Sequence, residues 1–566
     1  MTEKQKQTVD TIKQIALMIE QGKMSLEMCP VSDLKTVLYC VLDYKDNMDI
    51  TKQVVEQYCE LLEKTISNAQ ISDCCKLLMI MAHYISYELE KNAIYEEEYS
   101  QVVQELQNIK NENHLYDEII DCYKQNKIDE EFIKEHTYQS LVAIKEKGNI
   151  ELFKKLSKEI HDLQIKNIKS KKNKKIVFFL KDSAEWSCEE LYKKYAANPK
   201  YNIEIVVAPF FVGTEKTIYD TYFNTINYFK DRGYNTIGIY DVYQGRYKSW
   251  REIGLPDIVI HLNPHYTAFR QTSCICNFPL SILNVYIPYG FMIYGNTEHQ
   301  FNQLSHMLYW KIFCESVIHK EMAKKYSDIG DMNVVNSGYV KMDSFYLDNK
   351  IEYRKIWKIS ENADEKNVKR IIYAPHWSVK DAFTGFGNFD KIYNEIYNYA
   401  KENQATTSWV FRPHPMLRAG VVQQGVFNDE HEYDKYLDMW NKLPNAQVIE
   451  GGTYIDIFKS SDAMILDSVS FMAEYLYLHK PMLFLTRERN TFNDFGNALV
   501  EVLYKTEGGN FEGIKEFIEN VVIDEKDFMK KQRECFFENY LDYYKINGLY
   551  ASDYIFNYIN EIINER

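Results

Sequence analysis

The sequence lacks any apolar run near the ~18 residues that a membrane-spanning helix needs. Its first residues, MTEKQKQTVDTIKQ, also lack the apolar core of a secretory signal. We therefore expect a cytoplasmic protein that is neither exported nor integral to a membrane. If it works at a membrane, it does so peripherally, from the inner face.

Positive charge is in short supply as well. The chain has 67 basic against 82 acidic residues, a net charge of −15, whereas bulk nucleic-acid binding needs a broad basic surface. The 11 cysteines are scattered without the paired spacing of a zinc site, which predicts reduced thiols. We expect no nucleic-acid partner and no metal.

Several catalytic signatures are missing. There is no GxxxxGK(S/T) loop, no HExxH, no GxSxG and no DxD pair. If the protein binds a nucleotide diphosphate, its charge should then be neutralised by side chains and a helix terminus. No cofactor is expected.

What is present divides the 566 residues into several regions. Up to residue 165, apolar residues recur at three- and four-residue spacing and Gly and Pro are scarce, which predicts an all-helical N-terminal region over 1–165. The lysine-rich stretch 166–175 is interpreted as a solvated basic linker. The alternative is attraction of these lysines to anionic lipid headgroups.

Two series of short β-branched and aromatic runs follow, separated by helical patterns. The first series, 176–348, includes IVFFL and DIVIHLN, and the second, 349–540, includes KRIIYAPH, WVFRPHP and DAMILDS. A C-terminal helix fills 541–566. This alternation predicts an α/β fold with two facing Rossmann-like domains, a pair that binds ligands in the cleft between its members.

Polar side chains follow the strands of the second series, at the ends where open parallel sheets bind ligands. Arginine offers a planar fork to a diphosphate, serines at a helix N-terminus add donors, glycine allows close backbone approach, and a helix carboxylate suits ribose hydroxyls. The nucleotide- and phosphate-binding candidates are Arg412, Gly452, Thr453, Asp467, Ser468, Ser470 and Glu474.

Three histidines are the catalytic candidates. His376 and His414 follow the first two strands of the second series, and His414 is held between two prolines. A base for an acceptor hydroxyl should lie in the opposite lobe, where His265 follows Pro264 beyond a strand. Some candidates also have an interpretation that involves no ligand. A histidine can be purely structural, Asp467 or Ser468 can simply cap a helix, and Glu474 can be an exposed helix carboxylate.

As an ordered set, these motifs resemble the CDP-glycerol glycerophosphotransferase family of teichoic acid polymerases and primases. The set lies within about residues 175–540 and comprises Tyr373 to Ser378, His414-Pro415, Asp467 to Ser470 and Lys480-Pro481. The resemblance implies a GT-B fold, with the nucleotide in the C-terminal lobe and peripheral attachment to the cytoplasmic membrane.

The resemblance also implies a reaction. A hydroxyl of a growing cell-surface polymer or lipid-linked acceptor attacks the β-phosphate of CDP-glycerol, or of a related CDP-activated polyol donor, and CMP leaves. Two alternatives stay open. One is a GT-B glycosyltransferase that uses a nucleotide sugar for a capsule or surface glycan, and the other is a non-catalytic partner of such a synthesis complex.

One motif departs from the family. Many members carry Trp-His-Gly in the N-terminal lobe, and its histidine is thought to act as the base. The corresponding stretch, Val285 to Phe291, contains Tyr289-Gly290 and no histidine. Either His265 or His376 takes that role, or the acceptor and the chemistry differ.

Overall fold

The computed structural model describes residues 3–20, 23–25, 58–66, 74–75, 77–79, 81–82, 114–211, 215–346, 352–380, 385–450, 454–487 and 491–564. Two of the predicted nucleotide contacts, Gly452 and Thr453, lie outside these residues. The chain divides into two compact units, Met1–Glu159 and Ile160–Arg566.

The N-terminal unit is helical wherever it is described. α1 spans Glu3–Glu20, and helical residues follow at 58–66 and 114–124. Next come α6 (Glu130–Glu135), α7 (Gln139–Glu146) and α8 (Ile150–Lys169), which continues into the second unit. α6 begins where the Asp129 carboxylate accepts hydrogen bonds from two backbone amides of the first turn. The prediction of a helical N-terminal region is confirmed for these residues.

The lysine-rich stretch is shorter as a connection than the predicted linker 166–175. α8 continues to Lys169 and β1 begins at Lys174. Lysines favour the last turn of a helix because they meet the negative end of its dipole. Two others pair within the fold, Lys171 with the buried Asp257 and Lys175 with Glu204 at 2.6 Å. Part of this basic charge is thus used internally.

The first α/β lobe is built on a parallel sheet of seven strands in the order β3-β2-β1-β6-β7-β8-β9. Its central strand β1 is almost fully buried, as expected for an apolar strand with a helical layer on each face. The strands are β1 (Lys174–Leu180), β2 (Tyr201–Val207), β3 (Thr236–Gly238), β6 (Ile258–His261), β7 (Leu283–Tyr286), β8 (Lys311–Cys314) and β9 (Val334–Asn336), with a separate antiparallel pair of β4 (Tyr240–Asp241) and β5 (Arg246–Tyr247). The helices are α9 (Glu189–Ala196), α10 (Glu215–Lys230), α11 (Thr297–Phe301), α12 (Leu304–Leu308) and α13 (Val317–Tyr326).

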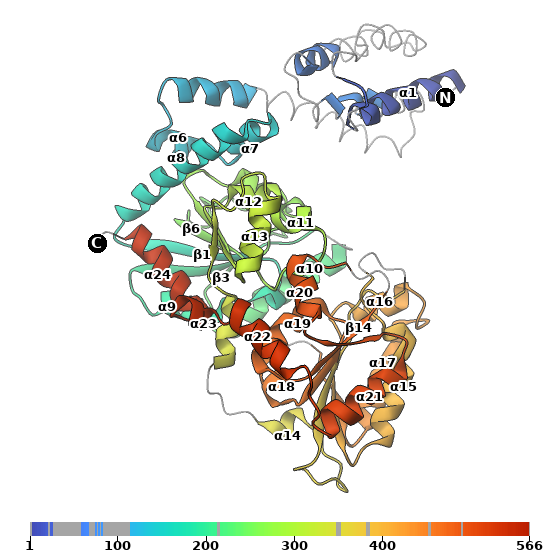
Figure 1. Cartoon of the computed structure of the whole chain (residues 1–566). Coiled ribbons are helices and arrows are strands. Elements are labelled where there is room, and N and C mark those ends of the chain that lie inside the picture. The colour runs from blue at the N-terminus through green and yellow to red at the C-terminus, as the bar shows by residue number, and fades with distance from the viewer. Residues whose placement is uncertain are drawn as a thin grey trace. The chain divides into compact units, whose positions relative to one another are not determined.

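The second lobe has a parallel sheet of six strands in the order β12-β11-β10-β13-β14-β15. Figure 1 shows it in yellow to orange, apart from the teal and green first sheet. The strands are β10 (Lys369–Ala374), β11 (Thr407–Phe411), β12 (Ala446–Val448), β13 (Ala463–Leu466), β14 (Met482–Thr486) and β15 (Tyr504–Glu507). The helices are α14 (Tyr353–Ile356), α15 (Phe389–Glu402), α16 (Leu417–Gln423), α17 (Glu430–Lys442), α18 (Ile455–Ser460), α19 (Val469–Tyr475), α20 (Asp494–Val500), α21 (Phe511–Glu516) and α22 (Lys530–Tyr540). Both strand orders are of the Rossmann type, which confirms the predicted pair of Rossmann-like lobes.

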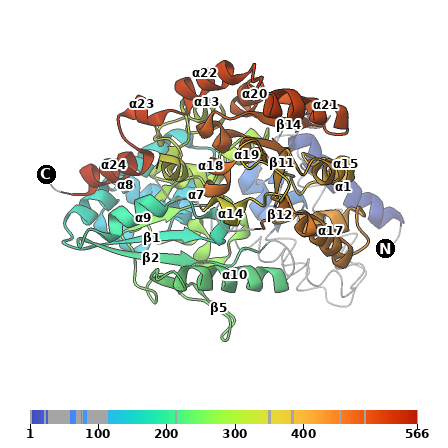
Figure 2. The same cartoon turned by 90° about the horizontal axis from the view of Figure 1, so that it is seen from below.

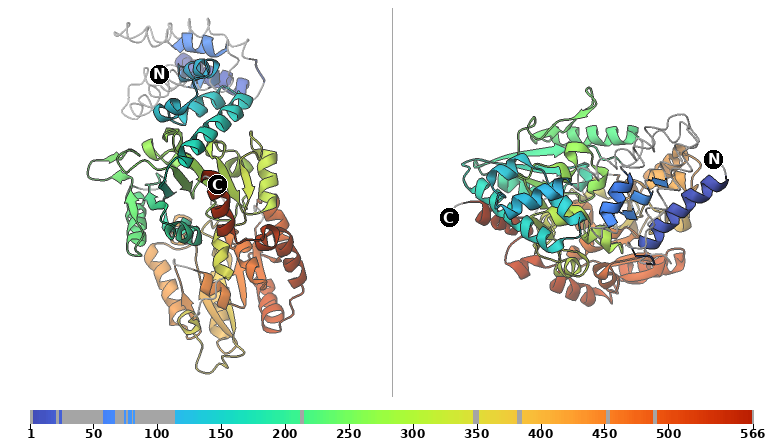
Figure 3. Two further views of the ribbon diagram at one scale, coloured as in Figure 1. Left: turned by 90° about the vertical axis from the view of Figure 1, so that its left-hand side faces the viewer. Right: turned by 90° about the horizontal axis from the view of Figure 1, so that it is seen from above.

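The chain crosses between the lobes twice. It leaves the first lobe through the 3-10 segment η6 (Val340–Tyr346). It returns after α22, because α23 (Tyr543–Asn547) and α24 (Ala551–Ile563) pack on the first lobe, α24 beside α9 (Figures 2 and 3). The buried Asp343 of η6 joins both crossings: it accepts from the Tyr543 hydroxyl at 2.5 Å and from the Ser552 amide at 2.8 Å.

A direct contact also joins the lobes. Tyr294 and Phe492 form an isolated antiparallel bridge, and the Asn493 side chain donates to the Met292 carbonyl at 2.7 Å. Gly496 lies so close to Ile293 that a Cβ atom there would stand 2.5 Å from its side chain. Within the described residues no helix is long and apolar enough to cross a membrane, and the cysteines are free.

Candidate functional site

The carboxyl ends of β10 and β13 are tied together by one carboxylate. Asp467, directly after β13, accepts a hydrogen bond from the His376 amide at 2.6 Å and one from the Asn388 amide at 2.5 Å. The Asn388 side chain in turn donates to the Leu485 carbonyl at 3.1 Å. The loops after three neighbouring strands are thus held in one arrangement around Asp467.

Asp467 differs from its prediction as a phosphate contact. Its side chain has no exposed surface, and both carboxylate oxygens are occupied by backbone donors. Burial raises the pKa of this carboxyl to about 7, against the lowering effect of the His376 and Asn388 amides. A buried carboxylate also repels a phosphate, so the structure gives Asp467 a positioning part instead.

His376 is nearly buried and is fixed by Ser378. The Ser378 amide donates to His376 Nδ1 at 3.2 Å, and the Ser378 hydroxyl lies 2.7 Å from the same nitrogen. A backbone N–H can only donate, so Nδ1 must carry no proton. Burial lowers the pKa of this imidazole, with the neighbouring His414 as a smaller cause. The ring is therefore neutral at pH 7, and its one N–H is at Nε2.

His414 repeats this arrangement. Its amide donates to the Pro375 carbonyl at 3.1 Å, and its Nδ1 accepts from the Met416 amide at 3.1 Å. Burial lowers its pKa to about 4, and its ring centroid lies 5.3 Å from that of His376. The second lobe therefore presents two adjacent neutral imidazoles, each with an Nε2–H donor available to a ligand.

Arg412 lies at the end of β11 with only a small exposed fraction. Its guanidinium donates to the Ile449 carbonyl at 3.2 Å and lies 5.7 Å from the ring centroid of Tyr454. Burial lowers its pKa from the ordinary arginine value. A guanidinium held in so little water binds an anion more strongly than one at an open surface.

Glu474 of α19 is buried, so the alternative interpretation as an exposed helix carboxylate is wrong. The Tyr454 hydroxyl donates to its Oε2. Burial raises the pKa of the carboxyl, and the ammonium of Lys341, which reaches this place from η6, opposes the shift. Contact of Glu474 with a ribose stays a prediction.

Ser468 and Ser470 lie where α19 begins, as predicted. Ser468 occupies the N-cap position, but its side chain makes no capping hydrogen bond. A Cβ atom built on Gly290 of the first lobe would lie 3.7 Å from the Cβ of Ser470. Ser470 therefore lies close to the loop after β7, where the sequence has Tyr289-Gly290. The contact of both serines with phosphate stays a prediction.

On the first lobe, His265 stacks on His299 at 4.4 Å between ring centroids. Burial lowers its pKa to about 4, with smaller effects from His299 and Lys181. Its Nδ1 lies 3.0 Å from the side-chain amide nitrogen of Gln303. The same nitrogen of Gln303 also donates to the His299 carbonyl, so in this arrangement His265 Nδ1 accepts, as in the second-lobe histidines, but from a side chain instead of a backbone amide.

Glu185 escaped the sequence analysis. Its buried carboxylate accepts from the Asn263 side chain at 2.6 Å and pairs with Lys181 at 3.1 Å, at the same strand ends as His265. It follows β1 by only a few residues, and that proximity to a strand end was the available signal.

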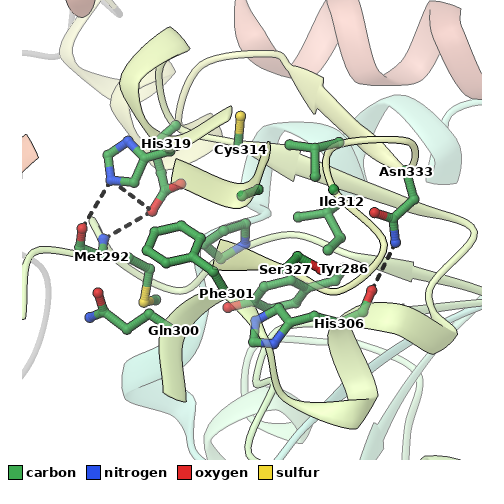
Figure 4. Close-up of a pocket in the computed structure, with 15 residues that line it drawn as sticks. Tyr286, Met292, Gln300, Phe301, His306, Ile312, Cys314, His319, Ser327 and Asn333 are labelled. Atoms are coloured by element: carbon green, nitrogen blue, oxygen red, sulfur yellow. Dashed lines mark hydrogen bonds and ion pairs between the residues drawn. The ribbon is translucent and has the colours of Figure 1, made fainter. Parts of the chain in front are cut away.

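A cavity lies in the first lobe, between β7, β8 and α13 (Figure 4). His319 lines one side: its Nε2–H donates to the Met292 carbonyl at 3.0 Å and lies 3.8 Å from Glu315. The cavity is separate from the strand ends of the second lobe that hold the predicted nucleotide contacts. Among the described residues, no group of three His, Cys, Asp or Glu side chains is placed to hold a metal ion.

Two Rossmann-type lobes with polar strand ends, joined by two crossings, define an enzyme of GT-B architecture. Residues 292–561 match the family model described as CDP-Glycerol:Poly(glycerophosphate) glycerophosphotransferase. This segment contains the second lobe, both crossings and all the second-lobe site residues. The resemblance to this family that the motifs predicted is thus confirmed over this segment.

Solved structures with similar folds include two classes of protein. A UDP-GlcNAc 2-epimerase from Neisseria meningitidis bound to UDP-GlcNAc has 16% identity and a TM-score of 0.42, over 68% of this chain and 99% of the epimerase. Two variants of the wall teichoic acid polymerase TagF have 14% identity and TM-scores of 0.44, over 72% and 74% of this chain and 93% and 95% of the polymerase. No curated protein sequence matches.

Proposed function

We propose that the protein transfers glycerol phosphate, or a related polyol phosphate, from a CDP-activated donor to a hydroxyl of a growing cell-surface polymer or lipid-linked acceptor. The observation that carries this proposal is the family match over 292–561, because it includes every strand end that holds the candidate nucleotide contacts. The donor binds on the second lobe, with the acceptor on the first.

In this reaction the acceptor oxygen forms a bond to the β-phosphorus of the donor, and the bond from that phosphorus to the bridging oxygen breaks. CMP leaves with the bridging oxygen. Arg412, Ser468 and Ser470 meet the charge that develops on the diphosphate. His376 and His414 add neutral Nε2–H donors, which stabilise a phosphoryl oxygen without needing protonation.

The hydroxyl proton goes to His265. A ring that accepts it at Nε2 must carry its own proton at Nδ1 beforehand. His376 and His414 each accept a backbone N–H at Nδ1. A backbone N–H cannot become an acceptor, so Nδ1 of these two rings cannot carry the proton. The Gln303 amide beside His265 is a side chain and can turn, at the cost of its bond to the His299 carbonyl. Its oxygen then accepts from Nδ1–H, which frees Nε2 as the base.

Attachment to the inner face of the cytoplasmic membrane is part of the proposal, since a lipid-linked acceptor would be presented there. Lys171 and Lys175 are engaged within the fold. The attachment surface therefore has to include other groups than the lysine-rich stretch alone.

Nucleotide release tests the proposal. The purified full-length chain is given CDP-glycerol, CDP-ribitol and common UDP-, GDP- and CMP-sugars, with a membrane-lipid extract as acceptor. Release of CMP from a CDP-polyol alone is the expected result. Release of UDP, GDP or sugar-dependent CMP would overturn the donor, and binding without turnover of any donor would identify a non-catalytic partner.

His265→Ala and His414→Ala separate the two histidine roles. Loss of the base slows transfer to the acceptor hydroxyl and leaves donor affinity unchanged. Loss of the His414 hydrogen bond to the phosphate lowers both the transfer rate and the affinity for the CDP-polyol. For one preorganised hydrogen-bond donor, the fall in kcat is about 100-fold. Equal behaviour of the two variants would contradict the assignment of His265 as the base.

A further inference from the structure

Lys341 lies at the start of η6, in the segment by which the chain leaves the first lobe. Its ammonium is 4.6 Å from the ring centroid of Tyr454 in the second lobe. Arg412 approaches the same ring, 5.7 Å from its centroid. Two cations from different parts of the chain therefore meet over one aromatic ring, at the predicted nucleotide edge.

The ammonium of Lys341 has no hydrogen bond and no ion pair within the described part of the chain, although its side chain is partly buried. An ammonium has three donors and loses much of its hydration when it is buried. Desolvation lowers the pKa of Lys341, Glu474 opposes that shift and Arg412 adds to it. Among the described residues, the groups that offset this loss of hydration are the Tyr454 ring and the carboxylate of Glu474, which lies beyond ion-pair distance.

The neighbouring Glu474 does not pair directly with Lys341. Its buried carboxylate makes no ion pair with this lysine among the described residues, and Tyr454 already donates to one of its oxygens. Lys341 therefore keeps a positive charge in a site with little water. That combination attracts an anion more strongly than a surface lysine does.

The position of Lys341 is fixed from both sides in sequence. The hydroxyl of Tyr339 donates to the Tyr289 carbonyl at the end of the β7 loop. Two residues beyond Lys341, Asp343 accepts from Tyr543 and from the amides of Ala551 and Ser552. The chain on both sides of Lys341 is therefore held by the first lobe and the returning C-terminal helices, which preorganises the place from which the ammonium reaches the second lobe.

We infer that Lys341 is a diphosphate-binding residue of the donor site, supplied to the second lobe by the crossing segment. This inference rests on the proposed function for the identity of the donor. It places one donor contact outside both sheets, on a segment whose position depends on how the lobes meet. Donor binding and the arrangement of the lobes are coupled through this one ammonium.

Calorimetric titration of the full-length chain with cytidine, CMP, CDP and CDP-glycerol tests the inference. Lys341→Met keeps the length of the side chain and removes its charge. A charge-assisted contact contributes about 1.5–3 kcal/mol, so this variant should bind CDP and CDP-glycerol about 10- to 100-fold more weakly. Its affinity for cytidine should equal that of the wild type. Lys341→Arg should recover part of the loss.

Lys324→Met is the matched control, because Lys324 is an exposed lysine of α13 that lies 4.0 Å from Glu321, one turn away on the same helix. It should bind every ligand as the wild type does. Thermal unfolding checks the fold, and Lys341→Gln replaces Lys341→Met if that variant does not fold. Equal affinity of wild type and Lys341→Met for CDP overturns the inference.

The same titration separates this inference from the proposed function. If the wild type binds UDP or GDP in place of CDP, the proposed donor is wrong. The preferred diphosphate then replaces CDP in the comparison. A loss in Lys341→Met supports the diphosphate contact, and equal affinity overturns it.

Discussion

Replacing Arg412 with alanine is the sharpest test of the donor site. The guanidinium is nearly buried, donates to the Ile449 carbonyl and approaches the ring of Tyr454. Removing one preorganised donor from a site with little water costs about 2.7–4 kcal/mol in the transition state, or roughly 100- to 1,000-fold in rate. We therefore expect kcat/KM for CMP release from CDP-glycerol to fall by that factor. Arg412→Lys keeps the charge but loses the planar fork of donors, so its kcat/KM should lie between those of the wild type and Arg412→Ala.

Arg418 provides a matched control from α16, the next helix along the chain. It pairs with Asp434 and lies 3.8 Å from Glu450, so its charge is already compensated. Arg418→Ala should lose less than about 1 kcal/mol of stability, as is usual for an exposed ion pair, and keep its turnover. Both variants are assayed at saturating and limiting donor, with thermal unfolding to confirm folding. A folded Arg412→Ala protein with a kcat/KM like that of Arg418→Ala would refute the assignment.

Three further outcomes follow from the geometry. Burial holds the pKa values of the candidate histidines well below 6.5, to about 4 for two of them, so kcat/KM should stay flat from pH 8 to about 5; an acidic limb near pH 6.5 would contradict this. Gly496→Ala brings a Cβ atom 2.5 Å from Ile293 and should cost about 1–3 kcal/mol in urea unfolding, whereas Gly509→Ala has ordinary contacts and should cost less than half as much. Asp467 has a folded-state pKa of about 7, above its ordinary 3.8, so its stabilising contribution is present at low pH and is lost as pH rises through 7. The free energy of unfolding of Asp467→Asn should therefore rise relative to that of the wild type by about 1.4 kcal/mol per pH unit between pH 5 and 7. If the difference between the two proteins does not depend on pH, the carboxyl is not buried as described.

Strands with apolar, β-branched sequences could be located from the sequence because a parallel strand covered on both faces must be apolar throughout. β15 (Tyr504–Glu507) was missed for the opposite reason: it lies at the edge of the sheet, alternates with exposed residues and reads YKTE. The lysine-rich stretch was interpreted as a linker because charge alone does not separate a helix end from a loop. There the decisive signal was the helix dipole, which favours lysines in a last turn.

The residues of the candidate site also divide into those that the sequence could predict and those that it could not. Residues that follow strands were predictable, because the ends of parallel strands converge on one edge. The positioning part of Asp467 was not, since nothing in the sequence says that two distant backbone amides meet its carboxylate. Lys341 was out of reach altogether: it stands more than a hundred residues before Tyr454, and only the crossing segment brings the two together.

The double crossing between the lobes limits how the two can move. A single connecting segment would let one lobe swivel freely about it. With η6 and the segment after α22 joined at Asp343, rotation about other axes would break its bonds to Tyr543, Ala551 and Ser552. The Tyr294–Phe492 bridge joins the lobes at a further place, so separating them would break contacts at both. The approach of Lys341 to the ring of Tyr454 therefore depends on the lobes meeting as they do here.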